Sequence, residues 1–155
     1  MHADGNKTMP DDETEKSESP VEESELLRVR RSKLQALLDA GVEPYRPFYG
    51  EPDEVQHAAD LAEKYASLEA GASSGQTAAV AGRLVAKREH GKATFGDIKD
   101  TSGKIQLLLR HDTLGEERYR QFSELDLGDW VGAAGEILRS RRGELSLAVS
   151  SWELL

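Results

Sequence analysis

Hydrophobic and polar residues alternate along the C-terminal half of the chain, and this period of two is typical of β-strands. The alternation predicts five strands over residues 77–87, 92–99, 104–110, 130–138 and 145–154, separated by turn-forming residues. Residues 114–125 have apolar side chains at helical spacing, which predicts a short helix between the third and fourth strands. Three strands, one helix and two strands is the order of an OB-fold barrel, and other small β-barrels share the five-strand pattern.

The N-terminal half follows a different pattern. Apolar residues at helical spacing predict helices over 22–40 and 53–68, and the Pro- and aromatic-rich residues 41–52 predict an extended connection. Residues 1–22 are mainly acidic residues, Ser and Pro, a composition that predicts disorder. We therefore expect a mainly β protein in three parts: a disordered acidic leader over 1–22, a helical extension over 23–76 and the five-stranded barrel over 77–155.

The alternation also assigns side chains to the two faces of the predicted sheet. Phe95 shares its face of the second strand with Asp97 and Lys99, and charged residues are rarely buried without partners, so we expect this set to face outward. The other strands yield an inward set and an outward set by the same reasoning. The inward set is Val80, Gly82, Leu84, Ala86, Ile105, Leu107, Leu109, Leu145, Leu147 and Val149, and the outward set includes Arg83, Lys87, Gln106, Glu144 and Ser146.

The outward residues are of the types that recognise single-stranded nucleic acid. A base stacks on an aromatic ring such as Phe95, while guanidinium, amide and carboxylate groups such as those of Arg83, Gln106 and Glu144 address base edges. Basic residues near the first turn and in the first helix could hold phosphates: Lys87, Arg88, Lys92, Arg28, Arg30, Arg31 and Lys33. Isolated surface phenylalanines and scattered basic residues also occur in proteins that bind no nucleic acid.

Charge and composition refine this picture. The net charge is −9, but residues 1–25 hold nine acidic and two basic residues, so the rest of the chain carries only −2. There is no cysteine, and the four histidines lack the spacing of metal ligands, so we expect no metal site. An apolar leader and a run of 18 apolar residues are also missing from the sequence, which predicts a cytoplasmic protein without a membrane partner.

A series of short motifs resembles a known family. It consists of RSKL at 31–34, GVEPY at 41–45, VAGR at 80–83, GKATF at 91–95, DTSGKIQL at 100–107, DLGD at 126–129 and GELS at 143–146. Their order is similar to that of the N-terminal anticodon-binding domain of class II lysyl-tRNA synthetases, over residues 25–155. The sequence departs from this pattern at Leu108, where the family commonly has Tyr, and at Trp130, where it has an aliphatic residue.

The resemblance implies an OB-fold that binds the uridine-rich anticodon of the lysine tRNA. By position, it implies that Phe95 stacks on an anticodon base, that Gln106 and Arg83 read base edges, and that Glu144 discriminates a neighbouring base. It also implies that the helix carrying the basic residues Arg28, Arg30, Arg31 and Lys33 approaches the backbone of the anticodon stem.

The expected partners are the lysine tRNA and either a catalytic domain or a homodimer partner. Members of this family continue into a catalytic domain that binds ATP and Mg²⁺. The present sequence contains no glycine-rich phosphate loop, no nucleophile–base pair and no metal-ligand set, so we expect no catalytic residue and no cofactor in this chain. Three alternatives remain: a free-standing module for single-stranded nucleic acid, a protein-interaction domain, and a fragment of a membrane lipid-lysylating fusion protein.

Overall fold

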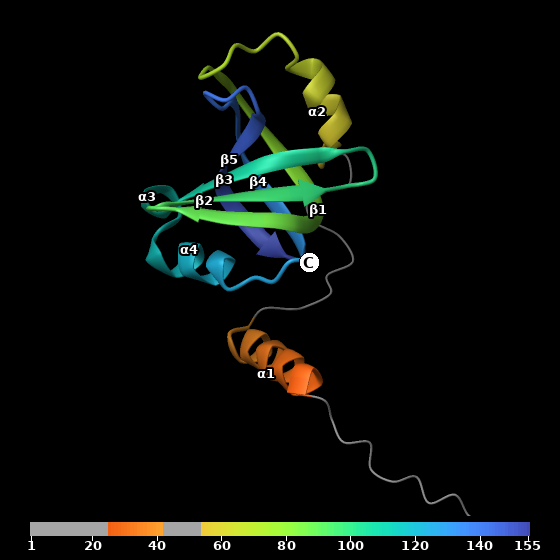
Figure 1. Ribbon diagram of the computed structural model, residues 1–155, viewed down its shortest axis with the longest axis vertical. Helices are drawn as coiled ribbons and strands as arrows, with labels where there is room; N and C mark the ends of the chain where they lie inside the picture. Colours follow the sequence, from red (N-terminus) through yellow and green to blue (C-terminus); the bar gives the residue numbers. More distant parts are fainter. Residues whose placement is uncertain (1–24, 42–53) are drawn as a thin grey trace, which may run out of the picture.

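The computed structural model describes residues 25–41 and 54–155, and the expectations for residues 1–22 and 42–53 lie outside this part. Its elements are four helices and five strands (Figure 1). The helices are α1 (Glu25–Asp39), α2 (Ala58–Lys64), α3 (His111–Leu114) and α4 (Glu116–Ser123). The strands are β1 (Ser73–His90), β2 (Ala93–Lys99), β3 (Lys104–Arg110), β4 (Trp130–Arg139) and β5 (Leu145–Leu154).

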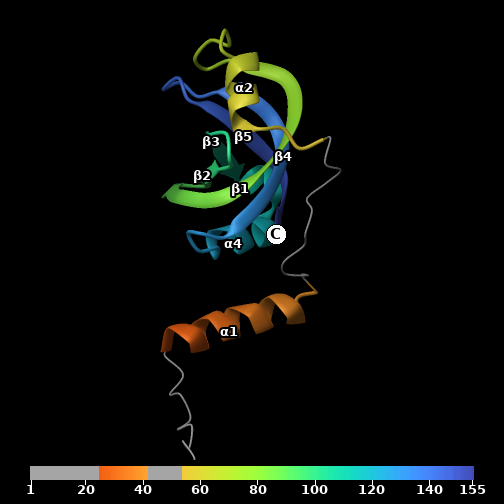
Figure 2. The same cartoon turned by 90° about the vertical axis from the view of Figure 1, so that its right-hand side faces the viewer.

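The strands form a closed barrel in the order β1-β2-β3-β5-β4, which confirms the predicted fold class. Neighbouring strands are antiparallel except for β3 and β5, which pair in parallel. The barrel closes because β1 is 18 residues long: its first half pairs with β4 and its second half with β2. The long, curved β1 can be followed in Figures 1 and 2.

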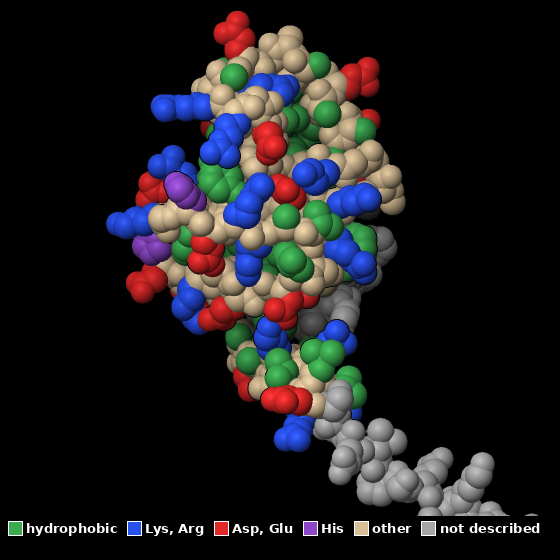
Figure 3. Space-filling model, viewed as in Figure 1, with side chains coloured by type: hydrophobic (Ala, Val, Ile, Leu, Met, Phe, Trp, Pro, Cys, Tyr) green, Lys and Arg blue, Asp and Glu red, His purple; other side chains and the backbone are tan. Residues whose placement is uncertain are grey.

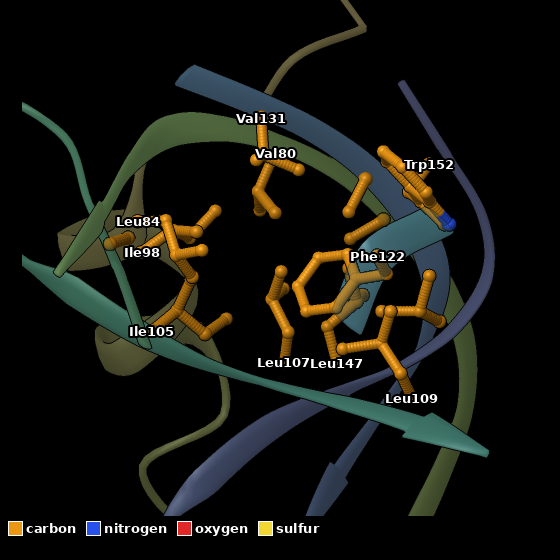
Figure 4. Close-up of a cluster of buried hydrophobic side chains, with 14 of the residues drawn as sticks. Val80, Leu84, Ile98, Ile105, Leu107, Leu109, Phe122, Val131, Leu147 and Trp152 are labelled. Atoms are coloured by element: carbon orange, nitrogen blue, oxygen red, sulfur yellow. The ribbon is translucent and has the colours of Figure 1, made fainter. Parts of the chain in front are cut away.

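Apolar side chains from all five strands fill the barrel, and α4 closes one end of it. Phe122 of α4 is fully buried and meets Trp152 of β5 edge to face, with ring centroids 5.3 Å apart. Figure 4 shows the Phe122 ring lying among Leu107, Leu109 and Leu147. The helical insert therefore supplies the largest fully buried side chain of the core.

A bulge in β1 corrects the face assignment of two residues. The register between β1 and β2 shifts between Leu84 and Ala86, so that Ala86 pairs with Asp97 and Lys87 with Gly96. Ala86 therefore shares the outer face with Asp97, and Lys87 points to the inner side, the reverse of the sequence-based expectation. The side chain of Lys87 reaches the end of the barrel, where its ammonium donates to the carbonyls of Ser123 and Leu125.

Two further boundaries differ from the prediction. The first strand was predicted to begin at residue 77, but Ser73 pairs with Leu138 and β1 begins there. The predicted helix over 114–125 is two short helices, because Gly115 adopts a φ of 78° that ends α3 before α4 begins.

Helix α2 is shorter than predicted and is fixed to the β2–β3 turn through Asp100. The carboxylate of Asp100 accepts hydrogen bonds from the Ala58 N–H (2.8 Å), from the Ser102 N–H and hydroxyl (2.7 Å each) and from the Gly103 N–H (2.8 Å). Burial raises the pKa of Asp100, but these hydrogen bonds outweigh it and lower the pKa to about 2. The first N–H of α2 is thus satisfied by the turn, and the N-cap residue is His57, which makes no side-chain cap.

Helix α1 lies outside the barrel (Figure 2). None of its 15 residues, all within the described part, is buried, and its apolar residues Leu26, Leu27, Val29 and Leu38 are 45–59% exposed. Lys33 forms an ion pair with Asp126 of the loop before β4, with 2.6 Å between Nζ and Oδ2. No helix within residues 25–41 and 54–155 is long and apolar enough to cross a membrane.

Candidate nucleic-acid interface

The outer face of β1, β2 and β3 carries the predicted site. In register across the three strands, Arg88 lies opposite Phe95, which lies opposite Leu108. Two residues further along β2, Asp97 lies opposite Gln106. Figure 3, which views this side of the molecule, shows Lys and Arg side chains over the three strands. The half-buried ring of Phe95 therefore lies on a face where Lys and Arg side chains are interspersed with acidic side chains.

Gln106 is held in place from the neighbouring strand β5. The parallel pairing of β3 with β5 sets Ser146 beside Gln106, and the Ser146 hydroxyl donates to the Gln106 Oε1 at 2.9 Å. Both residues are buried, with 8% and 1% of their surface exposed. Since the amide oxygen is used within the protein, the Nε2 group is the donor that would address a ligand.

Asp97 is a member of this face to which the sequence pattern assigned no role. Its side chain is 7% exposed and lies between two cations, with 3.5 Å from Oδ1 to Arg88 Nη2 and 3.2 Å from Oδ2 to Lys104 Nζ. Oδ1 is buried and accepts no hydrogen bond from any residue that the structure describes. The sequence signal for such a site is an acidic residue two positions after an outward aromatic residue.

The two arginines proposed for this face occupy different places. Arg83 pairs with Lys99, four residues along β2 from Phe95, which is roughly 13 Å at the rise of a strand. Its guanidinium lies 5.6 Å from the ring centroid of Trp130, which is 49% exposed. Arg88, expected only to contact the tRNA backbone, is the arginine beside Phe95.

Glu144 reaches the same surface from the β4–β5 turn. It is exposed and precedes Ser146 by two residues, so it lies next to the row that contains Gln106. Its backbone is fixed by two hydrogen bonds with Ser140: the Ser140 N–H donates to the Glu144 carbonyl at 2.8 Å, and the Glu144 N–H donates to the Ser140 hydroxyl at 3.1 Å. The structure therefore brings Phe95, Gln106 and Glu144 to one surface and places Arg83 at its margin.

The remaining basic residues divide into residues exposed on the surface and residues whose side chains are held inside the fold. Lys92 is exposed in the β1–β2 turn, and Arg28, Arg30, Arg31 and Lys33 are exposed on α1. Lys87 is used by the fold, as is Arg139, which donates to the carbonyls of Gly143 and Tyr65 at 2.8 and 2.9 Å. Lys87 is therefore omitted from the surface considered below.

The site has no features of a metal centre. In the described part of the chain, no three His, Cys, Asp or Glu side chains are grouped so as to hold a metal ion. The groups that this face offers are an aromatic ring, amide and carboxylate groups, and cationic side chains.

Comparison with known proteins defines the class of the domain. A family model described as an OB-fold nucleic acid binding domain matches residues 78–155, which include all of the outer-face residues named above. The chain therefore belongs to this family of nucleic-acid-binding domains.

Curated relatives place it more closely. Residues of this chain are 41% identical to the lysine–tRNA ligase of Thermoanaerobacter sp. (strain X514) over 85% of the chain, and 44% identical to that of Moorella thermoacetica over 86%. The lysine–tRNA ligase of Clostridium perfringens (strain SM101 / Type A) is 40% identical over 90% of the chain. The chain spans about a quarter of the length of these curated relatives and matches their N-terminal, anticodon-binding domain, which confirms the resemblance to lysyl-tRNA synthetases.

Proposed function

We propose that this chain binds the anticodon loop of the lysine tRNA through the outer face of β1, β2 and β3 and the adjoining β4–β5 turn. The observation that carries this proposal is the row formed by Arg88, Phe95 and Leu108, with Gln106 diagonal to the ring. A half-exposed ring on a strand, flanked by fixed hydrogen-bonding groups, suits an unstacked base whose edge must be read.

Each residue has a role that follows from its position. Phe95 supplies the stacking surface, and Gln106 donates through Nε2 to an acceptor on the base edge. Arg88 addresses the same base or its phosphate from β1, and Arg83 acts at the margin of the surface beside Trp130. Glu144 addresses a neighbouring base from the β4–β5 turn.

Phosphates of the anticodon arm meet the basic residues around this face. Lys92 lies in the β1–β2 turn, and the four exposed basic side chains of α1 extend the positive surface beyond the barrel. Phosphate contacts by such residues make affinity fall as the salt concentration rises. We propose that they orient the stem and that the residues on the strands choose the loop.

In the full ligase, this domain would serve aminoacylation by selecting the tRNA for a catalytic domain. ATP, Mg²⁺ and lysine would act in that domain. We propose that the ligase acts in the cytoplasm and that a catalytic domain or a homodimer partner accompanies this domain.

The proposal is tested by measuring the affinity of the chain for unmodified anticodon stem-loops at one salt concentration. Phe95→Ala should weaken binding of the lysine-type loop by about 1–3 kcal/mol, because it removes one stacked base. Leu127→Ala, which removes a 62% exposed apolar side chain from the loop before β4, is the matched control and should leave binding unchanged.

Two outcomes would contradict the proposal in different ways. Equal affinity for the lysine-type loop and an unrelated loop would indicate a general module for single-stranded nucleic acid. An unchanged affinity after Phe95→Ala would show that the ring is not a stacking surface and would favour a protein-interaction domain.

A further inference from the structure

The buried carboxylate of Asp97 has an acceptor oxygen that the free protein does not use. The side chain is only 7% exposed, and Oδ1 accepts no hydrogen bond from the described residues. Arg88 Nη2 is 3.5 Å from this oxygen, which is an ion pair without the geometry of a hydrogen bond. An unpaired buried acceptor is unfavourable, so a ligand that donates to it gains more than it would at an exposed carboxylate.

The neighbours of Asp97 are both hydrogen-bond donors. Arg88 stands on β1, on one side of β2, and Gln106 stands on β3, on the other side and directly opposite Asp97. Ser146 occupies the amide oxygen of Gln106 and so leaves Nε2 as the group that faces a ligand. Arg88 lies opposite Phe95 rather than Asp97, but its guanidinium reaches diagonally to Asp97, with 3.5 Å between Nη2 and Oδ1. The side chains around Asp97 therefore present a donor, an acceptor and a donor.

We propose that Asp97 is a specificity-determining residue that accepts the N3–H of a uracil base, between donors from Arg88 and Gln106. This inference rests on the proposed function, because it assigns one base of the bound loop to this row. Uracil presents O4, N3–H and O2, an acceptor, a donor and an acceptor, which is complementary to the order on the sheet. Stacking on Phe95, two residues before Asp97 on the same face, would hold the base edge toward this row.

The other bases do not match the three groups. Cytosine presents an acceptor at N3, which would meet the acceptor Oδ1 and leave both unpaired. Guanine presents two neighbouring donors, one of which would meet a donor of the protein. Adenine presents a donor beside N1, so it can satisfy only part of the row. Rejection of a base that leaves buried polar groups unpaired is stronger than rejection by shape alone.

The role of Asp97 is tested with the 155-residue chain and anticodon stem-loops that carry uridine, cytidine, N3-methyluridine or 2′-deoxyuridine at one loop position at a time. For the wild-type chain, one position should show a preference for uridine over both cytidine and N3-methyluridine of about ten- to a hundredfold, the effect of one charge-assisted hydrogen bond. The 2′-deoxyuridine loop should bind as the uridine loop does, which separates the base N–H from the ribose hydroxyl as donor.

Asp97→Asn should reduce both preferences at that position to less than about threefold, because an amide can rotate to donate where the carboxylate could only accept. Asp60→Asn, which removes the same charge from an exposed position on α2, is the control and should keep the wild-type preferences. Unfolding by urea, measured for each variant, separates lost stability from lost discrimination, since a damaged fold would weaken all four loops equally.

The outcomes distinguish this inference from the function on which it rests. If the wild-type chain binds no stem-loop, the proposed function fails. If it binds and prefers uridine, but Asp97→Asn keeps the full preference, then Asp97 does not accept the N3–H and only this inference is overturned. A loss of affinity for 2′-deoxyuridine with no effect of N3-methylation would also overturn it, by assigning the acceptor to the ribose.

Discussion

The inner and outer faces of β2 satisfy their polar groups to different degrees. On the inner face, the Thr94 hydroxyl is 2.9 Å from the Tyr119 hydroxyl, and Gly96 leaves room for the rings and methyl groups of Phe122 and Leu84. On the outer face, Asp97 is buried with an oxygen that has no hydrogen bond from the described residues. The polar groups of the inner face are paired within the protein, whereas one carboxylate oxygen of the outer face has no hydrogen bond from the described residues.

The contrast is sharpest between two carboxylates three residues apart. Asp100, in the turn that follows β2, accepts four hydrogen bonds and has its pKa lowered to about 2. Asp97 has two cations near it and one hydrogen bond, from Lys104. The first carboxylate stabilises the fold, and the second keeps one acceptor oxygen without a hydrogen bond from the described residues.

The largest effect on stability is expected when a phenylalanine of the inner or the outer side of the barrel wall, Phe122 or Phe95, is replaced by alanine. Phe122→Ala should lower the free energy of unfolding by about 3–5 kcal/mol, because it leaves a cavity in the closed end of the barrel. Phe95→Ala should lower it by only about 1 kcal/mol, because that ring is half-buried. Urea unfolding measures both, and equal losses would mean that the two faces contribute alike to stability.

A smaller effect on the free energy of unfolding is expected when the pH is lowered and Asp100 is protonated. The folded pKa of Asp100 is about 2 against an ordinary value of 3.8, so its contribution is fully present above about pH 4 and is lost as the pH falls toward 2. The difference corresponds to about 2 kcal/mol. Asp100→Asn should remove this part of the acid dependence in unfolding curves recorded from pH 5 to pH 2.

An acid dependence that survives Asp100→Asn would assign it to other carboxylates. Asp60→Asn is again the control, because Asp60 is exposed on the helix that Asp100 holds.

Lys87 and Arg88 are adjacent in β1 and lie on opposite faces of the barrel wall, so substituting each one tests the two faces separately. Lys87→Met should lower the free energy of unfolding by about 1–2 kcal/mol, since its ammonium binds two carbonyls at the end of α4, and should leave RNA affinity unchanged. Arg88→Met should lower RNA affinity, because Arg88 is exposed beside Phe95, and it also removes one of the two cations beside the buried Asp97 carboxylate. Filter binding and urea unfolding of the two variants would contradict the assignment if Lys87→Met lowered RNA affinity or Arg88→Met left it unchanged.

The smallest effect is expected at the contact between α1 and the barrel. The Lys33–Asp126 ion pair is 50% and 61% exposed, so Lys33→Ala and Asp126→Ala should show a coupling energy of less than about 1 kcal/mol in a double-mutant cycle. A larger value would mean that α1 is fixed to the barrel by more than this pair.

The period-two pattern predicted the order of the strands and most of the inward set, because each strand has one continuous apolar face. It did not predict the bulge after Leu84, since Val85 and Ala86 suit either face of a strand. The consequences were the wrong faces for Ala86 and Lys87 and a missed neighbour for Phe95, namely Arg88.

The burial of Asp97 and Gln106 was beyond the sequence for another reason. It depends on side chains from β1, β3 and β5 that converge only when the barrel closes. The sequence pattern of a single strand shows which face a residue lies on, but not how deeply its neighbours cover it.

The position of β5 between β3 and β4 links folding to recognition. β1, β2 and β3 form a local meander, whereas β5 pairs with β3 across about 40 residues of intervening chain, as Gln106 with Ser146 shows. Such non-local pairing is slow to form compared with hairpins. Gln106 therefore acquires its partner Ser146 only when β5 pairs with β3. Under the function proposed above, a chain that has not completed this step would bind RNA with less selectivity, because its amide would not be oriented.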